Sequence, residues 1–306
     1  MMRALVTGGA GFIGHSLSRR LLDEGAGVVI LDNLSSSTPV PLPRGARLVE
    51  GNVVDPPPLD GTFDVIYHLA SVASPPRYLE DPIGTLRAGA EGTRRMLDLA
   101  AASGATFVLA STSEIYGDPL VHPQPETYAG NVDITSPRAC YDEAKRYGEA
   151  LTNAYRRAGV VADARIARIF NTYGPAMAPD DGRIVTNFLT QAMAGRPLTI
   201  YGDGNQTRSF CYIDDLIDGL LLLAGSSVVD PVNLGNPSEI SINDLADIVA
   251  GLLGDTGREF RDLPAGDPMR RRPDITRARD LLGWEPTTTL EEGLAETVEY
   301  LAALDR

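Results

Sequence analysis

Short apolar runs alternate with longer amphipathic stretches along the first half of the chain. Runs rich in β-branched residues predict strands, and apolar residues at helical spacing predict helices with one buried face. The runs predict strands over residues 3–7, 28–31, 65–69, 106–110 and 161–169. The longer stretches predict helices over residues 11–24, 83–102 and 141–158. This order indicates an α/β fold with a doubly wound parallel sheet, the Rossmann arrangement, covered by helices on both faces.

The pattern becomes less regular after residue 174. It predicts helices over residues 186–194, 214–224, 242–253, 277–282 and 290–301, and a short strand over 198–201. We expect two domains: a Rossmann domain over residues 1–174, and a smaller C-terminal α/β domain over 175–306 that binds the substrate. Residues 202–227 are expected to return to the first domain. Doubly wound folds bind ligands at the carboxyl ends of their strands, so the smaller domain should cover that edge.

The composition narrows the class of protein. The chain has 306 residues, of which 43% are hydrophobic, and a net charge of −14. Such an acidic chain is unlike a nucleic-acid binder, which holds phosphates with clustered Lys and Arg. The sequence contains neither an apolar run of about 18 residues nor a signal-peptide pattern. Its two cysteines and three scattered histidines do not form the pattern of a disulfide framework or a metal site. We expect a cytoplasmic enzyme without a metal, membrane or nucleic-acid partner.

A glycine-rich turn follows the first predicted strand and begins the first predicted helix. Gly8, Gly11 and Gly14 have the spacing Gly-x-x-Gly-x-x-Gly. Glycines at this spacing allow a tight turn and let the backbone approach a pyrophosphate at the helix N-terminus. The next strand ends at Asp32, where a carboxylate can bind ribose hydroxyls, and Asn33 follows instead of an arginine. The pattern predicts a dinucleotide site, and the acid favours NAD over NADP.

Tyr141 and Lys145 are four residues apart and therefore lie on one face of the predicted helix. Lys145 is the single lysine among 27 basic residues. A phenol has a pKa of about 10 and is a poor base at neutral pH. A neighbouring ammonium favours the phenolate, so we expect Lys145 to lower the pKa of Tyr141 toward the working range. The spacing alone is also typical of a helix surface, but the glycine motif favours a catalytic pair.

Together with Ser-Thr-Ser at 111–113 and Arg-Ile-Phe-Asn-Thr-Tyr-Gly-Pro at 168–175, these motifs resemble the extended short-chain dehydrogenase/reductase family that acts on nucleotide sugars. Five further segments are most similar to its UDP-glucuronic acid decarboxylases: residues 73–78, 112–119, 137–143, 201–210 and 271–275. The resemblance covers nearly the whole chain. Two positions depart from the family pattern, because Gly89 stands where Asn is common and Asn52 stands where Asp is common.

The resemblance implies roles for the matching residues. Tyr141 would be the base, Lys145 would hold its phenolate and the nicotinamide ribose, and Thr112 would bond the sugar 4-hydroxyl. Glu114 and Arg271 would steer the step that follows oxidation. The remaining implied cofactor contacts are Phe12, Ile13, Asn33, Asn52, Val53, Leu69 and Ala70. The implied substrate contacts are Pro76, Arg77, Tyr78, Ser113, Asn171, Asn187, Tyr201, Arg208 and Arg271.

On this resemblance the substrate is a UDP-sugar, UDP-glucuronate, and NAD is a bound catalyst that is reduced and restored within one turnover. Oxidation at C4 makes a ketone β to the C6 carboxylate, and loss of CO2 followed by reduction gives UDP-xylose. A 4-epimerase shares the first step but usually lacks an acid at the position of Glu114. A 4,6-dehydratase is expected to have an Asp-Glu pair, whereas Ser113 precedes Glu114 here.

Two further expectations concern the protein as a whole. A non-enzymatic dinucleotide sensor would be expected to lose Tyr141 or Lys145, and both are present. The helices predicted over 83–102 and 141–158 carry more apolar positions than one sheet face requires. Relatives pair two such helices with two from a second subunit, so we expect a homodimer with an isologous interface.

Overall fold

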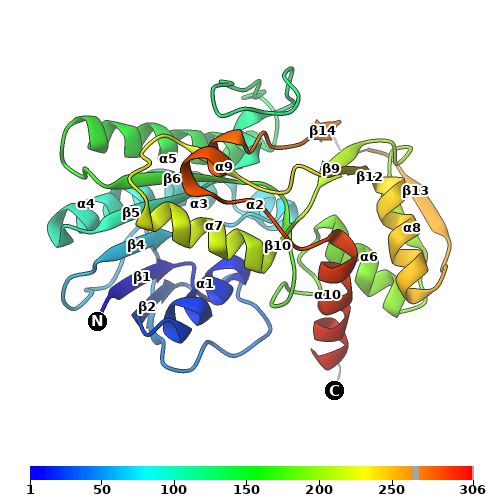
Figure 1. The fold of residues 1–306 in the computed structure, drawn as a ribbon, viewed down its shortest axis with the longest axis horizontal. Coiled ribbons are helices and arrows are strands. Elements are labelled where there is room, and N and C mark those ends of the chain that lie inside the picture. The colour runs from blue at the N-terminus through cyan, green and yellow to red at the C-terminus, as the bar shows by residue number, and fades with distance from the viewer. Residues whose placement is uncertain (264–268, 305–306) are drawn as a thin grey trace.

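The computed structural model describes residues 1–263 and 269–304. Its larger part is a seven-stranded parallel sheet with the strand order β11-β6-β5-β4-β1-β2-β3 (Figure 1). The strands are β1 (Arg3–Thr7), β2 (Gly27–Asp32), β3 (Arg47–Glu50), β4 (Val65–His68), β5 (Thr106–Thr112), β6 (Ala164–Ile169) and β11 (Val232–Leu234). The order reverses between β1 and β4, as in a doubly wound fold, so the predicted Rossmann sheet is confirmed.

Helices cover both faces of this sheet. α1 (Phe12–Asp23) and α7 (Ile213–Gly225) pack against each other on one face, and α4 (Thr93–Ser103) and α5 (Ala139–Arg157) pack together on the other. Alternate residues of β1 serve the two faces: Ala4 and Val6 belong to the apolar core with α1, and Leu5 belongs to the core with α4. This alternation follows from the two-residue period of a strand.

The helix expected over residues 83–102 is present as a continuous helical run over 82–103, but a π-helical turn interrupts its α-helical spacing. The chain forms α2 (Pro75–Glu80) and α3 (Pro82–Arg87), then a π-helical turn, η1 (Ala88–Gly92), and then α4. Two glycines of this turn approach neighbouring segments closely. A Cβ at Gly89 would lie 2.6 Å from that of Ala144, and one at Gly92 would lie 2.7 Å from the Val53 side chain. The wider turn therefore sits tightly against α5, an insertion that simple helical spacing does not reveal.

The C-terminal half contributes α6 (Ile184–Met193), α8 (Ile242–Leu253), α9 (Thr276–Leu282) and α10 (Leu290–Leu304), close to the predicted helices. Its strands form three small sheets, with the orders β12-β9-β14, β13-β8 and β10-β7. They are β7 (Thr172–Tyr173), β8 (Leu198–Tyr201), β9 (Thr207–Ser209), β10 (Cys211–Tyr212), β12 (Glu239–Ser241), β13 (Arg258–Arg261) and β14 (Arg270–Arg271). Only β8 among these was expected. Two predicted site residues, Arg208 and Arg271, lie on β9 and β14, which pair in parallel.

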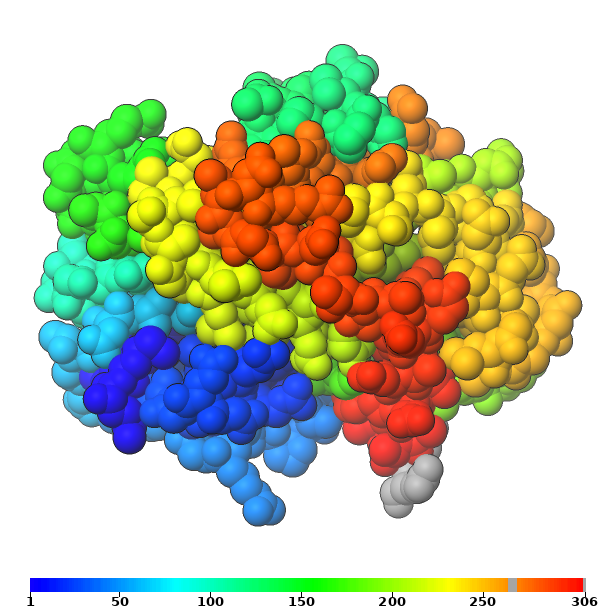
Figure 2. Space-filling view, in the orientation of Figure 1, coloured from blue at the N-terminus to red at the C-terminus, as the bar shows by residue number. Residues whose placement is uncertain are grey.

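The chain returns to the large sheet after crossing the smaller sheets. β11 pairs with β6, and α9 packs on both α7 and β11. In Figures 1 and 2 this C-terminal segment, coloured orange, lies directly on the yellow segment that contains α7. The division at residue 174 stays a prediction. Over the described ranges, no helix is long and apolar enough to cross a membrane.

Candidate active site

The glycine turn after β1 forms a close-fitting cradle. Gly8 has a φ of +72°, and a Cβ there would lie 2.9 Å from the Ala70 backbone nitrogen. A Cβ at Gly14 would lie 2.1 Å from the Gly8 carbonyl oxygen. Both positions therefore require glycine. Within the described part of the chain no side chain caps the α1 N-terminus at Gly11, so its first N–H groups remain for an anionic ligand.

Asp32 is held at the carboxyl end of β2. Its buried carboxylate accepts hydrogen bonds from the backbone N–H groups of Ala10, at 2.9 Å, and Leu34, at 2.8 Å. Asn33 is exposed, and its side-chain oxygen accepts from the Ser35 N–H and hydroxyl. These contacts fix the Asp32 carboxylate beside the glycine turn, so the two predicted halves of a dinucleotide site come together.

The other predicted cofactor residues line the neighbouring strand ends. The N–H groups of Leu69 and Ala70 bond the Thr7 carbonyl and hydroxyl oxygens, at 3.1 and 3.2 Å, which ties the end of β4 to β1. Val53 is buried, and the Asn52 side chain accepts from the Val54 N–H at 2.9 Å in an exposed turn. Phe12 and Ile13 pack in the core at the start of α1.

Tyr141 and Lys145 both lie on α5 and are both buried. The Tyr141 ring stacks on that of Tyr78, with centroids 5.1 Å apart and planes 4° from parallel. The Lys145 Nζ donates to the Ala110 carbonyl oxygen at 2.8 Å and lies 5.7 Å from the Tyr141 ring centroid. Burial lowers the pKa of Lys145 to about 8.

The expected lowering of the Tyr141 pKa is not what this structure shows. Burial raises the pKa of Tyr141, and a hydrogen bond with Thr112 opposes that rise only in part. The Lys145 ammonium is directed at a backbone carbonyl, so desolvation of the phenol dominates. The hydrogen bond from Thr112 is therefore the contact that favours the Tyr141 phenolate.

Glu114 and Arg271 form an ion pair in which Arg271 is buried and Glu114 is partly buried, although the sequence separates them widely. Glu114 lies in η2 (Ser113–Tyr116), the 3₁₀ turn after β5, and its N–H donates to the Thr112 hydroxyl at 3.3 Å. Its second carboxylate oxygen accepts from Arg138 at 2.8 Å. Burial alone would raise the pKa of Glu114, but the two arginines lower it to about 2. Glu114 is therefore ionised throughout the neutral range.

Sequence reasoning missed two residues of this cluster. Arg138 and Asp142 are three residues before and one residue after Tyr141, where α5 begins. Asp142 is buried, and its Oδ1 has no hydrogen-bond partner among the described residues. Burial first, and then the charge of Glu114, raise the pKa of Asp142 to about 7. Arg138 precedes Tyr141 by three residues and Asp142 by four, a spacing that places side chains on one helix face. This spacing could have indicated Arg138 and Asp142 from the sequence.

Arg183 was also missed. Its guanidinium carbon lies 5.8 Å from the Phe12 ring centroid and it pairs with Asp181. Its charge acts to lower the pKa of Tyr141. An isolated arginine before a helix gives no pattern that sequence analysis could use.

The predicted substrate residues fall into two groups. Arg208 on β9 is buried and stands in register with Arg271 on β14, and Tyr78 and Ser113 are buried beside Tyr141 and Glu114. The other members lie on α2, on α6 and at strand ends. Arg77 pairs with Asp180 at 3.4 Å, the Asn187 amide donates to the Gly182 carbonyl at 3.0 Å, Pro76 packs beside Gly182, Asn171 bonds the Cys211 N–H through its carbonyl, and Tyr201 is 38% exposed.

Comparison with known proteins identifies the fold and its cofactor class. A family model described as the NAD dependent epimerase/dehydratase family matches residues 4–235. The chain belongs to this family. Its cofactor is NAD. The glycine cradle and the Asp32 carboxylate lie side by side, where we expect NAD to bind.

Three known proteins are similar to this chain in sequence or in structure. UDP-glucuronic acid decarboxylase 1 of Xenopus tropicalis is 48% identical over 97% of this chain and 72% of its own. The UDP-glucose 4-epimerase of Thermotoga maritima, solved with UDP-glucose, superposes with a TM-score of 0.91 at 30% identity over the whole of both chains. The UDP-glucuronic acid 4-epimerase of Bacillus cereus, solved with UDP-glucuronic acid and NAD, has a TM-score of 0.87 at 28% identity over 99% of this chain and 100% of its own. The predicted family is confirmed.

Proposed function

We propose that this protein is an NAD-dependent UDP-glucuronate decarboxylase that forms UDP-xylose. The observation that carries the proposal is the Glu114 carboxylate, which two arginines hold ionised two residues beyond Thr112. The curated relative from Xenopus, a UDP-glucuronic acid decarboxylase at 48% identity, supports the same activity.

The first step is oxidation at C4 of the sugar. Tyr141 takes the proton of the substrate 4-hydroxyl. The Thr112 hydroxyl bonds Tyr141 and keeps the Tyr141 oxygen aligned with the substrate 4-oxygen. Lys145 is buried on the same face of α5, with its Nζ bonded to the Ala110 carbonyl and 5.7 Å from the Tyr141 ring centroid. From there its ammonium would serve the phenolate and the cofactor ribose. NAD, which the glycine cradle and Asp32 would hold, would supply the hydride acceptor for C4 and a positive charge that favours the phenolate.

The second step is loss of CO2 from the 4-keto acid. Decarboxylation requires the C5–C6 bond to stand nearly perpendicular to the carbonyl, and it leaves negative charge on the C4 oxygen. The Tyr141 and Thr112 hydroxyls are donors fixed near one another and suit that oxygen. The fixed charge of Glu114 orients the substrate carboxylate by repulsion or through an ordered water. With a pKa of about 2, Glu114 holds no proton to give.

Protonation at C5 and return of the hydride complete the reaction. An arginine is always protonated at working pH and is a poor acid, so Arg271 orients a water relay to C5 rather than donating a proton itself. The product is a UDP-pentose, and the cofactor is restored to its starting state.

A UDP-glucuronate 4-epimerase is the second candidate. The structure of the Bacillus cereus UDP-glucuronic acid 4-epimerase resembles this chain closely, and both reactions begin with the same oxidation. An epimerase must keep the carboxylate near the ring plane, where the 4-keto acid is protected from losing CO2. The ion pair between Glu114 and Arg271 favours decarboxylation instead.

Product analysis separates the two activities. Purified protein is mixed with UDP-glucuronate, and CO2 and the sugar nucleotides are followed by NMR. We expect CO2 and a UDP-pentose in equal amounts. UDP-galacturonate without CO2 would establish the epimerase and overturn the proposed decarboxylase.

The proposal extends to the assembly. Four large apolar or aromatic side chains are exposed on α2, α3 and α5: Leu79, Ile83, Leu86 and Tyr147. α3 packs on α5, so the last three belong to one helical layer on the outside of the sheet. An exposed apolar layer of this kind suits a homodimer with an isologous helical interface.

A further inference from the structure

Asn233, in the middle of the last strand of the large sheet, has its whole amide engaged in buried hydrogen bonds. Its Nδ2 donates to the carbonyl oxygens of Gln124, at 2.9 Å, and Asp274, at 3.0 Å. Its Oδ1 accepts from the Tyr116 hydroxyl at 2.8 Å. Asn233 and Gln124 are both 0% exposed. The amide therefore joins three segments that lie far apart in the sequence.

Gln124 fixes the segment that carries Arg271. Its N–H donates to the Arg272 carbonyl oxygen and its Oε1 accepts from the Arg272 N–H, both at 2.9 Å. Its carbonyl oxygen accepts from the Asp274 N–H at 3.0 Å. The residues immediately after Arg271 are therefore held by Gln124, which is held by Asn233.

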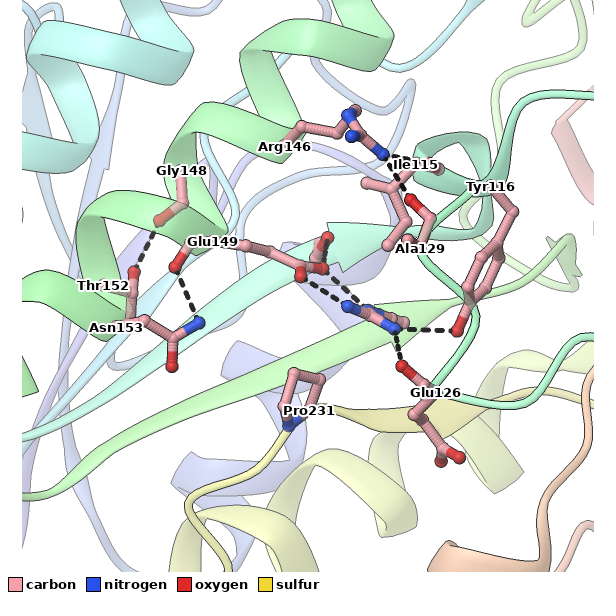
Figure 3. Close-up of polar contacts among 12 residues, drawn as sticks. Ile115, Tyr116, Glu126, Ala129, Arg146, Gly148, Glu149, Thr152, Asn153 and Pro231 are labelled. Carbon is pink, nitrogen blue, oxygen red and sulfur yellow. Dashed lines mark hydrogen bonds and ion pairs between the residues drawn. The ribbon is translucent and has the colours of Figure 1, made fainter. Parts of the chain in front are cut away.

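Tyr116 fixes the segment that carries Glu114. Its hydroxyl accepts from Arg168 at 3.0 Å, and Arg168 forms a bidentate ion pair with Glu149, at 2.9 and 2.8 Å. Glu149 in turn accepts from the Ser111 hydroxyl at 2.6 Å. Figure 3 shows Glu149 and Tyr116 reaching from α5 and η2 toward this shared centre. The network thus holds the chain on both sides of Glu114.

We propose that Tyr116 and Asn233 are positioning residues that set Arg271 against Glu114 and thereby control the decarboxylation step. This inference rests on the proposed function. Glu114 also bonds Arg138, so a shift of Arg271 leaves the carboxylate turned toward Arg138 alone. Buried hydrogen-bond networks of this kind fix the positions of active-site side chains as closely as catalysis requires.

The network separates the two chemical steps. The bond between Tyr116 and Asn233 is the link that acts on Glu114 and Arg271, because Tyr116 stands two residues beyond Glu114 and Asn233 holds Arg272 through Gln124. The bonds of Glu149 with Arg168 and Ser111, beside Ala110 and Thr112, do not involve the Tyr116 hydroxyl. Lys145, by contrast, bonds the Ala110 carbonyl, and Tyr141 stacks on Tyr78. Loosening the network should therefore slow CO2 release while C4 oxidation proceeds. A purely structural role would lower stability and leave the balance between the two steps unchanged.

Tyr116→Phe is the sharpest variant, because it removes one hydroxyl and keeps the ring. Tyr173→Phe is a matched control: both tyrosines are 1% exposed, and the Tyr173 hydroxyl bonds the Leu290 carbonyl at 3.2 Å. In single turnovers of the NAD-loaded enzyme with UDP-glucuronate, NADH formation and CO2 release are followed together. For Tyr116→Phe we expect CO2 release to fall about tenfold, NADH formation to change less than about twofold, and bound NADH to accumulate.

The outcomes divide clearly. The same balance between oxidation and CO2 release in Tyr116→Phe as in wild type would overturn the positioning role, whatever its melting temperature. Equal accumulation of NADH in Tyr173→Phe would also overturn it, because any lost buried hydroxyl would then have the effect. Asn233→Asp keeps the side-chain shape but turns an acceptor oxygen toward the carbonyl oxygens of Gln124 and Asp274. Bound NADH should therefore accumulate to a higher level in this variant than in Tyr116→Phe. Wild-type enzyme that releases no CO2 would instead overturn the proposed function.

Discussion

Glu114, which is partly buried, and Arg271, which is buried, form an ion pair across 157 residues of sequence. Arg138 bonds the other carboxylate oxygen at 2.8 Å, so Glu114 is held from two sides. This arrangement makes Glu114 a fixed negative charge, because its pKa of about 2 keeps it ionised in the neutral range. Such a charge can orient a substrate carboxylate, but it cannot serve as the proton donor to C5.

Glu114→Ala and Arg271→Ala should slow CO2 release about 100-fold while weakening substrate binding only a few-fold, because both act on the orientation of the reacting bond. Rates and calorimetric affinities for UDP-glucuronate provide the comparison. Arg165→Ala is the control, since Arg165 is equally buried but bonds Ser226, away from the site. Equal losses of rate and affinity in the Glu114 and Arg271 variants would contradict the assigned role.

Tyr141→Phe should reduce turnover at least about 1000-fold, because the base for the 4-hydroxyl is lost. The ring stack on Tyr78 and the glycine cradle remain, so NAD binding should be nearly unchanged. Steady-state rates and NAD titration test both parts. A variant that kept a tenth of the wild-type rate would show that another group is the base.

NADP(H) should bind about 100-fold more weakly than NAD(H), because a 2′-phosphate would meet the Asp32 carboxylate. That carboxylate is buried and held by two backbone N–H groups, so it cannot turn away easily. Calorimetry with the two cofactors measures the difference, and Asp32→Asn should narrow it. Equal affinities in the wild type would refute the assignment of Asp32.

Asp142 should make stability depend on pH. Its pKa is about 7 in the folded protein, against an ordinary value of 3.8, so the folded state binds the extra proton between these limits. Its contribution to stability is therefore full below pH 4 and is lost as the pH rises through 7. Asp142→Asn removes this loss, so the melting temperature of the variant relative to wild type should increase from pH 4 to pH 8. A difference that stays constant with pH would contradict the raised pKa.

Light scattering should report a dimer at micromolar concentration. Ile83→Glu places a charge on the exposed helical layer and should produce monomer, whereas Ile134→Glu, at a similarly exposed isoleucine outside that layer, should not. Wild-type monomer, or an equal effect of both substitutions, would refute the proposed interface.

Local patterns accounted for what the sequence predicted well. The large strands carry continuous apolar runs because helices bury both faces of the sheet, and the glycine turn and the Tyr141–Lys145 spacing each lie within one element. β3 was missed because its residues are mostly exposed, and β9, β12 and β14 were missed because two or three residues show no periodicity.

The pairings at the site depend on tertiary structure. Arg138 and Asp142 gain their significance only when η2 brings Glu114 opposite the start of α5. The pKa of Tyr141 was predicted in the wrong direction because spacing does not reveal desolvation, or that Lys145 bonds the Ala110 carbonyl. Resemblance had indicated Glu114 and Arg271, but their contact depends on the bonds of Gln124 with Arg272 and on the pairing of β14 with β9, which together hold the Arg271 segment.

An isotope experiment can show whether this site decarboxylates UDP-glucuronate. The enzyme is incubated with UDP-glucuronate in deuterated water, and the sugar nucleotide is examined by NMR. Decarboxylation passes through an enolate that takes its proton from solvent. We therefore expect release of CO2 and a UDP-pentose with deuterium at C5. UDP-galacturonate without deuterium and without CO2 would contradict it.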